Sequence, residues 1–166
     1  MSPSLLLAAG TVVGRALALH HLPTHGHLEA CFRQIARILK PGGAVYLVDL
    51  GRLKSLKSVL YFAYMNAAHQ PHIFSLDYER SLRAAFLRED FEAMSKRYLA
   101  TEVEVYTTFK IPVLHIVKTP DRALSPEMRA RFQTMRRELP RQYRGDLDDI
   151  RLFTRLGGLR NDPFAG

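Results

Sequence analysis

The segment from Leu17 to Gly51 constrains the fold of this chain more than any other part of the sequence. Apolar residues recur at spacings of three and four between positions 28 and 39, which predicts an amphipathic helix that Thr24 can cap. The Pro-Gly-Gly sequence at 41–43 ends this helix, because proline cannot continue it and glycine readily adopts the left-handed backbone of a C-cap. Ala44 to Leu50 is a continuous β-favouring run, typical of a central strand buried on both faces.

The sequence on either side predicts further elements. A short buried strand at 11–13 and a loop over 14–23 precede this segment. Apolar spacing then predicts helices at Arg52 to Ala68, Leu76 to Leu87 and Arg88 to Tyr98. The first of these should end before Pro71, and we expect its apolar side to consist of Leu53, Leu56, Leu60, Ala63 and Tyr64.

The periodicity changes to two after residue 101. Alternation predicts strands at 102–106 and 109–117, which a tight Thr107-Thr108 connection would join as an antiparallel hairpin. Pro112 cannot donate to a ladder and therefore marks an edge or a bulge. Two more helices follow, one from Ser125-Pro126 to Pro140 with an apolar side, and one from Asp146 to Leu156.

Composition narrows the class of protein. The chain has 166 residues, 47% of them hydrophobic, which suits one domain with a packed core. The net charge of +8 is not gathered into a block, so nucleic-acid binding is not expected. The single cysteine, Cys31, excludes an internal disulfide. The apolar N-terminus lacks a basic start and is shorter than the ~20 residues that span a bilayer, so we expect a soluble cytoplasmic protein without a membrane partner.

Several motifs follow one another in an informative order. ALHHLP at 18–23 precedes a helix ending in RILKPGG and a strand ending in Asp49; SLRAAF, REDFEAM and the predicted hairpin come later. In this order, residues 13–118 resemble the class I S-adenosylmethionine-dependent methyltransferases. The resemblance implies an α/β fold, namely a partial Rossmann-like methyltransferase sheet whose last strands include a C-terminal antiparallel hairpin, with flanking helices. It divides the chain into a methyltransferase part over 1–118 and a helical C-terminal extension over 119–166.

The resemblance also implies a site, with S-adenosylmethionine as cofactor and a small-molecule methyl acceptor as partner. The residues expected to meet the cofactor are Arg15, Ala16, Leu17 and His20. His21 is the candidate general base. The groups expected to approach the acceptor are Asp49, Tyr61, Tyr64 and the segment from His69 to Asp77. Taken by themselves, Asp49 favours capping of a helix N-terminus, and the two tyrosines favour core packing.

The sequence departs from the family pattern at the cofactor side. Thr11 stands where the family usually has Asp, and Arg15 where a small polar residue is common. The glycine-rich turn and the acidic residue that binds the ribose are missing, and GTVVG at 10–14 lacks the required spacing. We therefore interpret the chain as the C-terminal part of a methyltransferase, a fragment or half of a split protein, that is not autonomously active.

Two further hypotheses concern partners. The rival function is a non-catalytic remnant that acts as an interaction module, pairing or forming a homodimer through an exposed edge strand at 11–13. The histidines at 20, 21, 25 and 27 suggest a metal, but no cysteine or carboxylate cluster completes a ligand set, so no metal site is expected.

Overall fold

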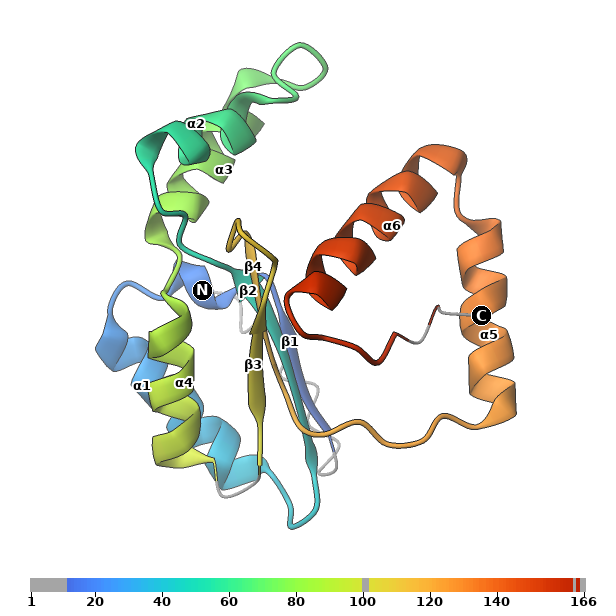
Figure 1. Cartoon of the computed structure of the whole chain (residues 1–166). Coiled ribbons are helices and arrows are strands. Elements are labelled where there is room, and N and C mark those ends of the chain that lie inside the picture. Colours follow the sequence, from blue (N-terminus) through green and yellow to red (C-terminus); the bar gives the residue numbers. More distant parts are fainter. Residues whose placement is uncertain (1–11, 100–101, 163, 165–166) are drawn as a thin grey trace.

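A four-stranded mixed sheet lies at the centre of the fold (Figure 1). The computed structural model describes residues 12–99, 102–162 and 164. Strands β1 (Val12–Ala16) and β2 (Ala44–Leu50) are parallel, and β4 (Leu114–Lys118) lies antiparallel between β2 and β3 (Glu104–Thr107). The predicted α/β class is confirmed as a mixed sheet with flanking helices and an antiparallel hairpin.

Helix α1 (His25–Ile38) connects the two parallel strands. The Thr24 side chain accepts a hydrogen bond from a backbone N–H of its first turn, and Gly42 supplies a left-handed turn behind it at a φ of 70°. The chain then enters β2 with Ala44 opposite Val12. The helix and the central position of the strand predicted for this segment are confirmed, but Tyr46 is 47% exposed, so β2 is not buried on both faces as predicted. Strand β1 is longer than predicted and ends at Ala16; position 11 lies outside the described residues.

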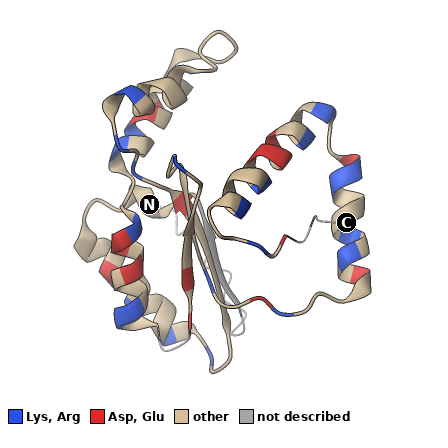
Figure 2. Ribbon diagram, in the orientation of Figure 1, with Lys and Arg blue, Asp and Glu red and all other residues tan. Residues whose placement is uncertain are grey.

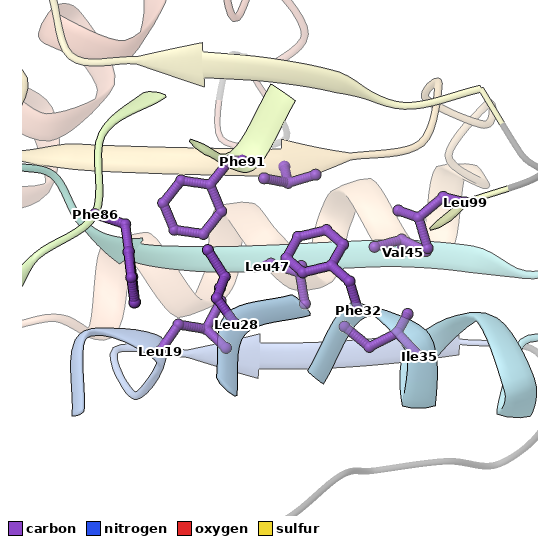
Figure 3. Packing of buried hydrophobic residues seen from close by; sticks show 10 residues of the cluster. Leu19, Leu28, Phe32, Ile35, Val45, Leu47, Phe86, Phe91 and Leu99 are labelled. Carbon is purple, nitrogen blue, oxygen red and sulfur yellow. The ribbon is translucent and has the colours of Figure 1, made fainter. Parts of the chain in front are cut away.

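The main core lies between one face of the sheet and two helices, α1 and α4 (Arg88–Tyr98), as Figures 1 and 3 show. The range of α4 is the predicted one. Ten buried side chains form this cluster: Leu19, Leu28, Phe32, Ile35, Val45, Leu47, Phe86, Phe91, Leu99 and Val117. The rings of Phe32 and Phe91 lie 6.5 Å apart, and truncation of such a buried ring to alanine costs about 3–5 kcal/mol.

Helices α2 (Leu56–Tyr64) and α3 (His72–Ala84) pack on each other past the end of β2. The predicted start of α2 at Arg52 is wrong, because the Ser55 hydroxyl accepts the Ser58 N–H and begins the helix there. The predicted range of α3 is also wrong: it begins four residues earlier, directly after Pro71.

The predicted apolar side of α2 is only partly correct. Leu56 and Leu60 are 54% and 41% exposed. The helix buries Ala63, as predicted, and Val59 in place of the two leucines; both belong to a second cluster with Leu82 of α3. The main partner of α2 is another helix, α3, with Leu50 of β2 in the same cluster, so a different stripe is covered.

The hairpin turn is longer than the tight connection predicted at Thr107-Thr108. Thr108 organises it, since its hydroxyl donates to the Ile111 carbonyl at 2.6 Å and accepts the Val113 N–H at 2.9 Å. Pro112 lies in this turn, outside the ladder, as its missing N–H requires.

Helices α5 (Pro126–Glu138) and α6 (Arg141–Leu156) lie on the opposite side of the sheet from α1 and α4 (Figure 1). The start of α5 is confirmed, whereas α6 begins five residues before the predicted Asp146. The predicted apolar side of α5 is not buried, since α5 has no buried residue among those described. The end of α6 reaches the sheet at Gly157, where a Cβ would lie 1.8 Å from the Thr107 carbonyl oxygen. The division of the chain after residue 118 stays a prediction.

Candidate functional site

The carboxyl ends of β1 and β2 lie at the same edge of the sheet, the edge outside which open α/β sheets bind ligands. Two segments leave it: residues 17–24 after β1 and residues 51–55 after β2. The first contains η1 (Leu19–His21), a single turn of 3-10 helix. Leu17 begins this segment with a left-handed φ of 48° and donates its N–H to the Val48 carbonyl at 2.7 Å.

Asp49 holds η1 against the end of β2. Its carboxylate is 1% exposed and accepts hydrogen bonds from the backbone N–H groups of Leu19, His20 and Leu50. Its Oδ1 also lies 2.5 Å from Nδ1 of the His20 ring. Because a carboxylate only accepts, Nδ1 carries the proton. Asp49 therefore fixes both the backbone of η1 and the tautomer of His20.

A cleft of ≈ 390 Å³ opens between η1 and α3. The charged and imidazole groups in its wall are His20, His21, His25, Arg52, Asp77 and Arg80. The Arg52 Nε donates to the Ala85 carbonyl at 2.8 Å, which orients the guanidinium. This lining, with two guanidiniums and one carboxylate, suits a polar small molecule with negatively charged or hydrogen-bonding groups.

Two of the predicted site residues, His20 and His21, line this cleft, and Asp49 lies buried behind them, bound to the His20 ring. The His20 and His21 rings lie 4.2 Å apart. His20 is only 5% exposed, and its Nδ1 is bound to Asp49. His21, in contrast, is exposed to the cleft. Asp49 acts here as the hydrogen-bond acceptor for η1, which is the capping role that its residue type favours.

The other predicted residues lie elsewhere. Arg15 and Ala16 were predicted in a loop, but both belong to β1, opposite Leu47 and Val48. Leu17 follows them with its side chain 52% exposed.

The two tyrosines of α2 do not line the cleft. Tyr61 is 64% exposed. The Tyr64 hydroxyl donates to the Glu79 carboxylate at 2.9 Å, and this hydrogen bond raises the pKa of Tyr64. Of the segment from His69 to Asp77, Asp77 lines the cleft.

Sequence reasoning did not identify Arg52 and Arg80. Arg52 lies three residues after Asp49, at the carboxyl end of a central strand, and this position in the sequence indicates a ligand-binding residue. Arg80 carries no such signal, because only the packing of α3 brings it to η1.

Within the described residues, no group of three or more His, Cys, Asp or Glu could hold a metal ion. His25 lies 3.2 Å from Asp90, away from the pair formed by His20 and Asp49. No helix in the described part of the chain is long and apolar enough to cross a bilayer. Figure 2 shows Lys and Arg distributed over several helices and loops.

Comparison with known proteins identifies no family: no family model and no curated protein matches the chain. A solved structure described as a possible exported protein from Bordetella parapertussis is similar to it, with a TM-score of 0.45 and 15% sequence identity. The match covers 68% of this chain and 39% of the Bordetella chain, so this chain spans well under half the length of that protein.

Proposed function

We propose that this chain is the C-terminal part of a class I S-adenosylmethionine-dependent methyltransferase domain, with the cleft beside η1 as the acceptor side of its site. The observation that carries the proposal is the sheet order. A parallel pair, β1 and β2, continues into a hairpin whose second strand, β4, lies between β2 and β3. This agrees with the last strands of a Rossmann-like methyltransferase sheet completed by an antiparallel hairpin.

The residues of this chain fit one end of the cofactor. Residues 17–21, held in place by Asp49, form a fixed backbone turn at the carboxyl end of β1 that can contact the methionine end. The sequence has no glycine-rich turn with the spacing that holds the nucleoside side of such a ligand. S-adenosylmethionine supplies a methyl group bound to a sulfonium. We therefore assign to this chain the acceptor side and no methyl transfer on its own.

The cleft residues have separate tasks in this proposal. His21, exposed beside the buried pair of His20 and Asp49, accepts a proton from the methyl acceptor. Arg52 and Arg80 attract an acidic group of the acceptor, and Asp77 accepts a hydrogen bond from it. Alignment of the two reactants supplies most of the acceleration in such a transfer. The proposal keeps the expected cytoplasmic location.

A titration of the ¹⁵N-labelled chain with S-adenosylhomocysteine tests the proposal. We expect amide shifts limited to residues 17–22 and 51–54, with a dissociation constant of about 1 mM, since only one end of the ligand is held. Adenosine, which lacks the methionine end, should leave these amides unchanged. Shifts that are absent from this edge, or that adenosine reproduces, would refute the assignment. Saturable micromolar binding would instead show that the chain holds the whole cofactor.

The second candidate is an interaction module that pairs through a sheet edge. It is favoured by β1, which has a strand partner on one side only among residues 12–99, 102–162 and 164. Light scattering after size exclusion distinguishes this function: a homodimer supports it, and a monomer at micromolar concentration contradicts it.

A further inference from the structure

His115 is a buried polar residue that the proposed methyl transfer does not use. It lies in β4, opposite Asp49 on one side and Thr107 on the other, and it is 2% exposed. Neither of its ring nitrogens has a hydrogen-bond partner among the described residues. Burying an imidazole in this way costs free energy that a leucine or phenylalanine at the same place would avoid.

The missing side chain of Gly51 leaves room for the His115 ring. A Cβ on Gly51 would lie 2.6 Å from Nε2 of His115 and 2.1 Å from the Pro112 carbonyl oxygen, so only glycine fits between the ring and the turn. On another side the ring lies 5.7 Å from that of Phe91. The imidazole is thus enclosed at a defined position.

His115 contributes to the wall of a pocket of ≈ 260 Å³ at the end of β2. Four basic side chains from three separate segments line the same pocket: Arg52, Lys54, Arg88 and Lys110. Glu89 is the acidic residue in that lining. Four cations against one carboxylate make this pocket electropositive.

The N-terminus of α4 adds to this field. Leu87, Arg88 and Glu89 line the pocket. The Leu87 N–H donates to the Asp90 carboxylate, whereas the backbone N–H groups of Arg88 and Glu89 belong to the first turn, which has no acceptor within the helix. Their partial positive charge favours an oxyanion. The buried, unpartnered imidazole is the independent observation that marks this helix start as a site.

We propose that the pocket between residues 52–54, the start of α4 and the β3–β4 turn binds the oxyanion group of a small ligand, a phosphate ester or a carboxylate, with His115 at its base. Lys54 and Lys110, on opposite segments, neutralise the charge. The neutral imidazole donates one hydrogen bond to the ligand. The proposal is independent of methyl transfer, because the pocket differs from the cleft beside η1, although Arg52 lines both.

Protonation of His115 is linked to this binding. Burial, with a smaller contribution from Arg88 of α4, lowers the pKa of His115 to about 4. Glu89 and Glu92 of α4 and Asp49 of β2 act in the opposite direction. A bound anion adds negative charge near the ring, so its pKa should rise and binding should take up protons between pH 4 and 6.

The experiment titrates the ¹³C,¹⁵N-labelled full chain at pH 7 with sodium phosphate, pyrophosphate and acetate, at constant ionic strength set with sodium chloride. We expect saturable shifts of the His115 ring signals. Stronger binding of the phosphates identifies a phosphate ester as the ligand class, and stronger binding of acetate identifies a carboxylate.

The matched variants are Lys54→Gln with Lys110→Gln, and Lys57→Gln as the control. These three lysines are exposed, so the fold should be retained. The double variant should weaken anion binding by about fivefold or more, because two exposed charges are lost, and the control should bind as the wild type does. Absence of saturable His115 shifts with all three anions, or equal loss in the control, would overturn the proposal. Anion binding that takes up no protons at pH 5 would also contradict the proposal.

Discussion

Replacing Asp49 should release η1 from the sheet. In Asp49→Ala the N–H groups of Leu19 and His20 and the Nδ1–H of the His20 ring lose their acceptor inside the protein. Leu50 N–H loses the same carboxylate. The pair is 5% and 1% exposed, so water does not replace these bonds without opening the structure.

The magnitude follows from the number of bonds. A hydrogen bond inside a protein contributes about 1 kcal/mol net, and four of them together contribute about 4 kcal/mol. Asp49→Asn keeps one acceptor oxygen and the side-chain volume, so about half of that loss is expected. Most domains are stabilised by about 5–15 kcal/mol, so the alanine variant should stay folded with a large part of its stability lost.

Urea unfolding followed by circular dichroism at pH 7 measures this loss. With a slope of about 2 kcal/mol per M, the midpoint for Asp49→Ala should fall by about 2 M. Asp77→Ala is the control, because this carboxylate is exposed on the same cleft and should change the free energy of unfolding by no more than ~0.5 kcal/mol. A loss below about 1 kcal/mol in Asp49→Ala, or an equal loss in the control, would refute the role given to this network.

Two further predictions concern positions where the structure is tightly constrained. Gly51→Ala should lower the free energy of unfolding by about 1–3 kcal/mol or more in the same assay, because its Cβ would meet the Pro112 carbonyl, whereas Gly145→Ala, with open space in α6, should be neutral or stabilising. His115 has a folded pKa of about 4, below its unfolded value of 6.5, so the unfolded state binds more protons between these values and stability should fall by about 2 kcal/mol from pH 7 to 5. His115→Gln should abolish most of that dependence, and an unchanged pH profile in this variant would contradict the assignment.

The elements that the sequence predicted best are those whose start and stop signals lie next to them in the chain. The stripe at Leu28, Phe32 and Ile35, closed by Pro41 and Gly42, predicted α1 because period and stop signal agree. The ranges of β2 and α4 were predicted to the residue. In each case the residues that decide the structure are neighbours in the chain.

The elements predicted poorly depend on partners distant in the sequence. Leu56 and Leu60 have the right spacing for a buried stripe, yet α2 packs on α3 through Val59 and Ala63. The hairpin turn depends on the hydroxyl of Thr108, which no alternation pattern reveals. Tertiary packing decided these cases over local propensity.

The candidate site shows the same division. The end of β2 and the histidines after β1 could be predicted as a site region, because the carboxyl ends of parallel strands meet at one edge. That His20 would be buried on Asp49, 29 residues away, could not be predicted, since it depends on how η1 closes onto the sheet. The family and the methyl transfer stay predictions.

The short stretch from Asp49 to Arg52 connects the cleft beside η1 with the basic pocket at His115. Asp49 fixes η1 and so one wall of the cleft, Gly51 lets the His115 ring approach the strand end, and Arg52 lines both the cleft and the basic pocket. The Arg52 Nε donates to the carbonyl of Ala85 at the end of α3, so the position of this guanidinium depends on both β2 and α3. Arg52→Gln should therefore weaken ligand binding on both sides, whereas Arg80→Gln should affect the cleft alone. If the two titrations responded equally to Arg80→Gln, the cleft and the basic pocket would have to be one site.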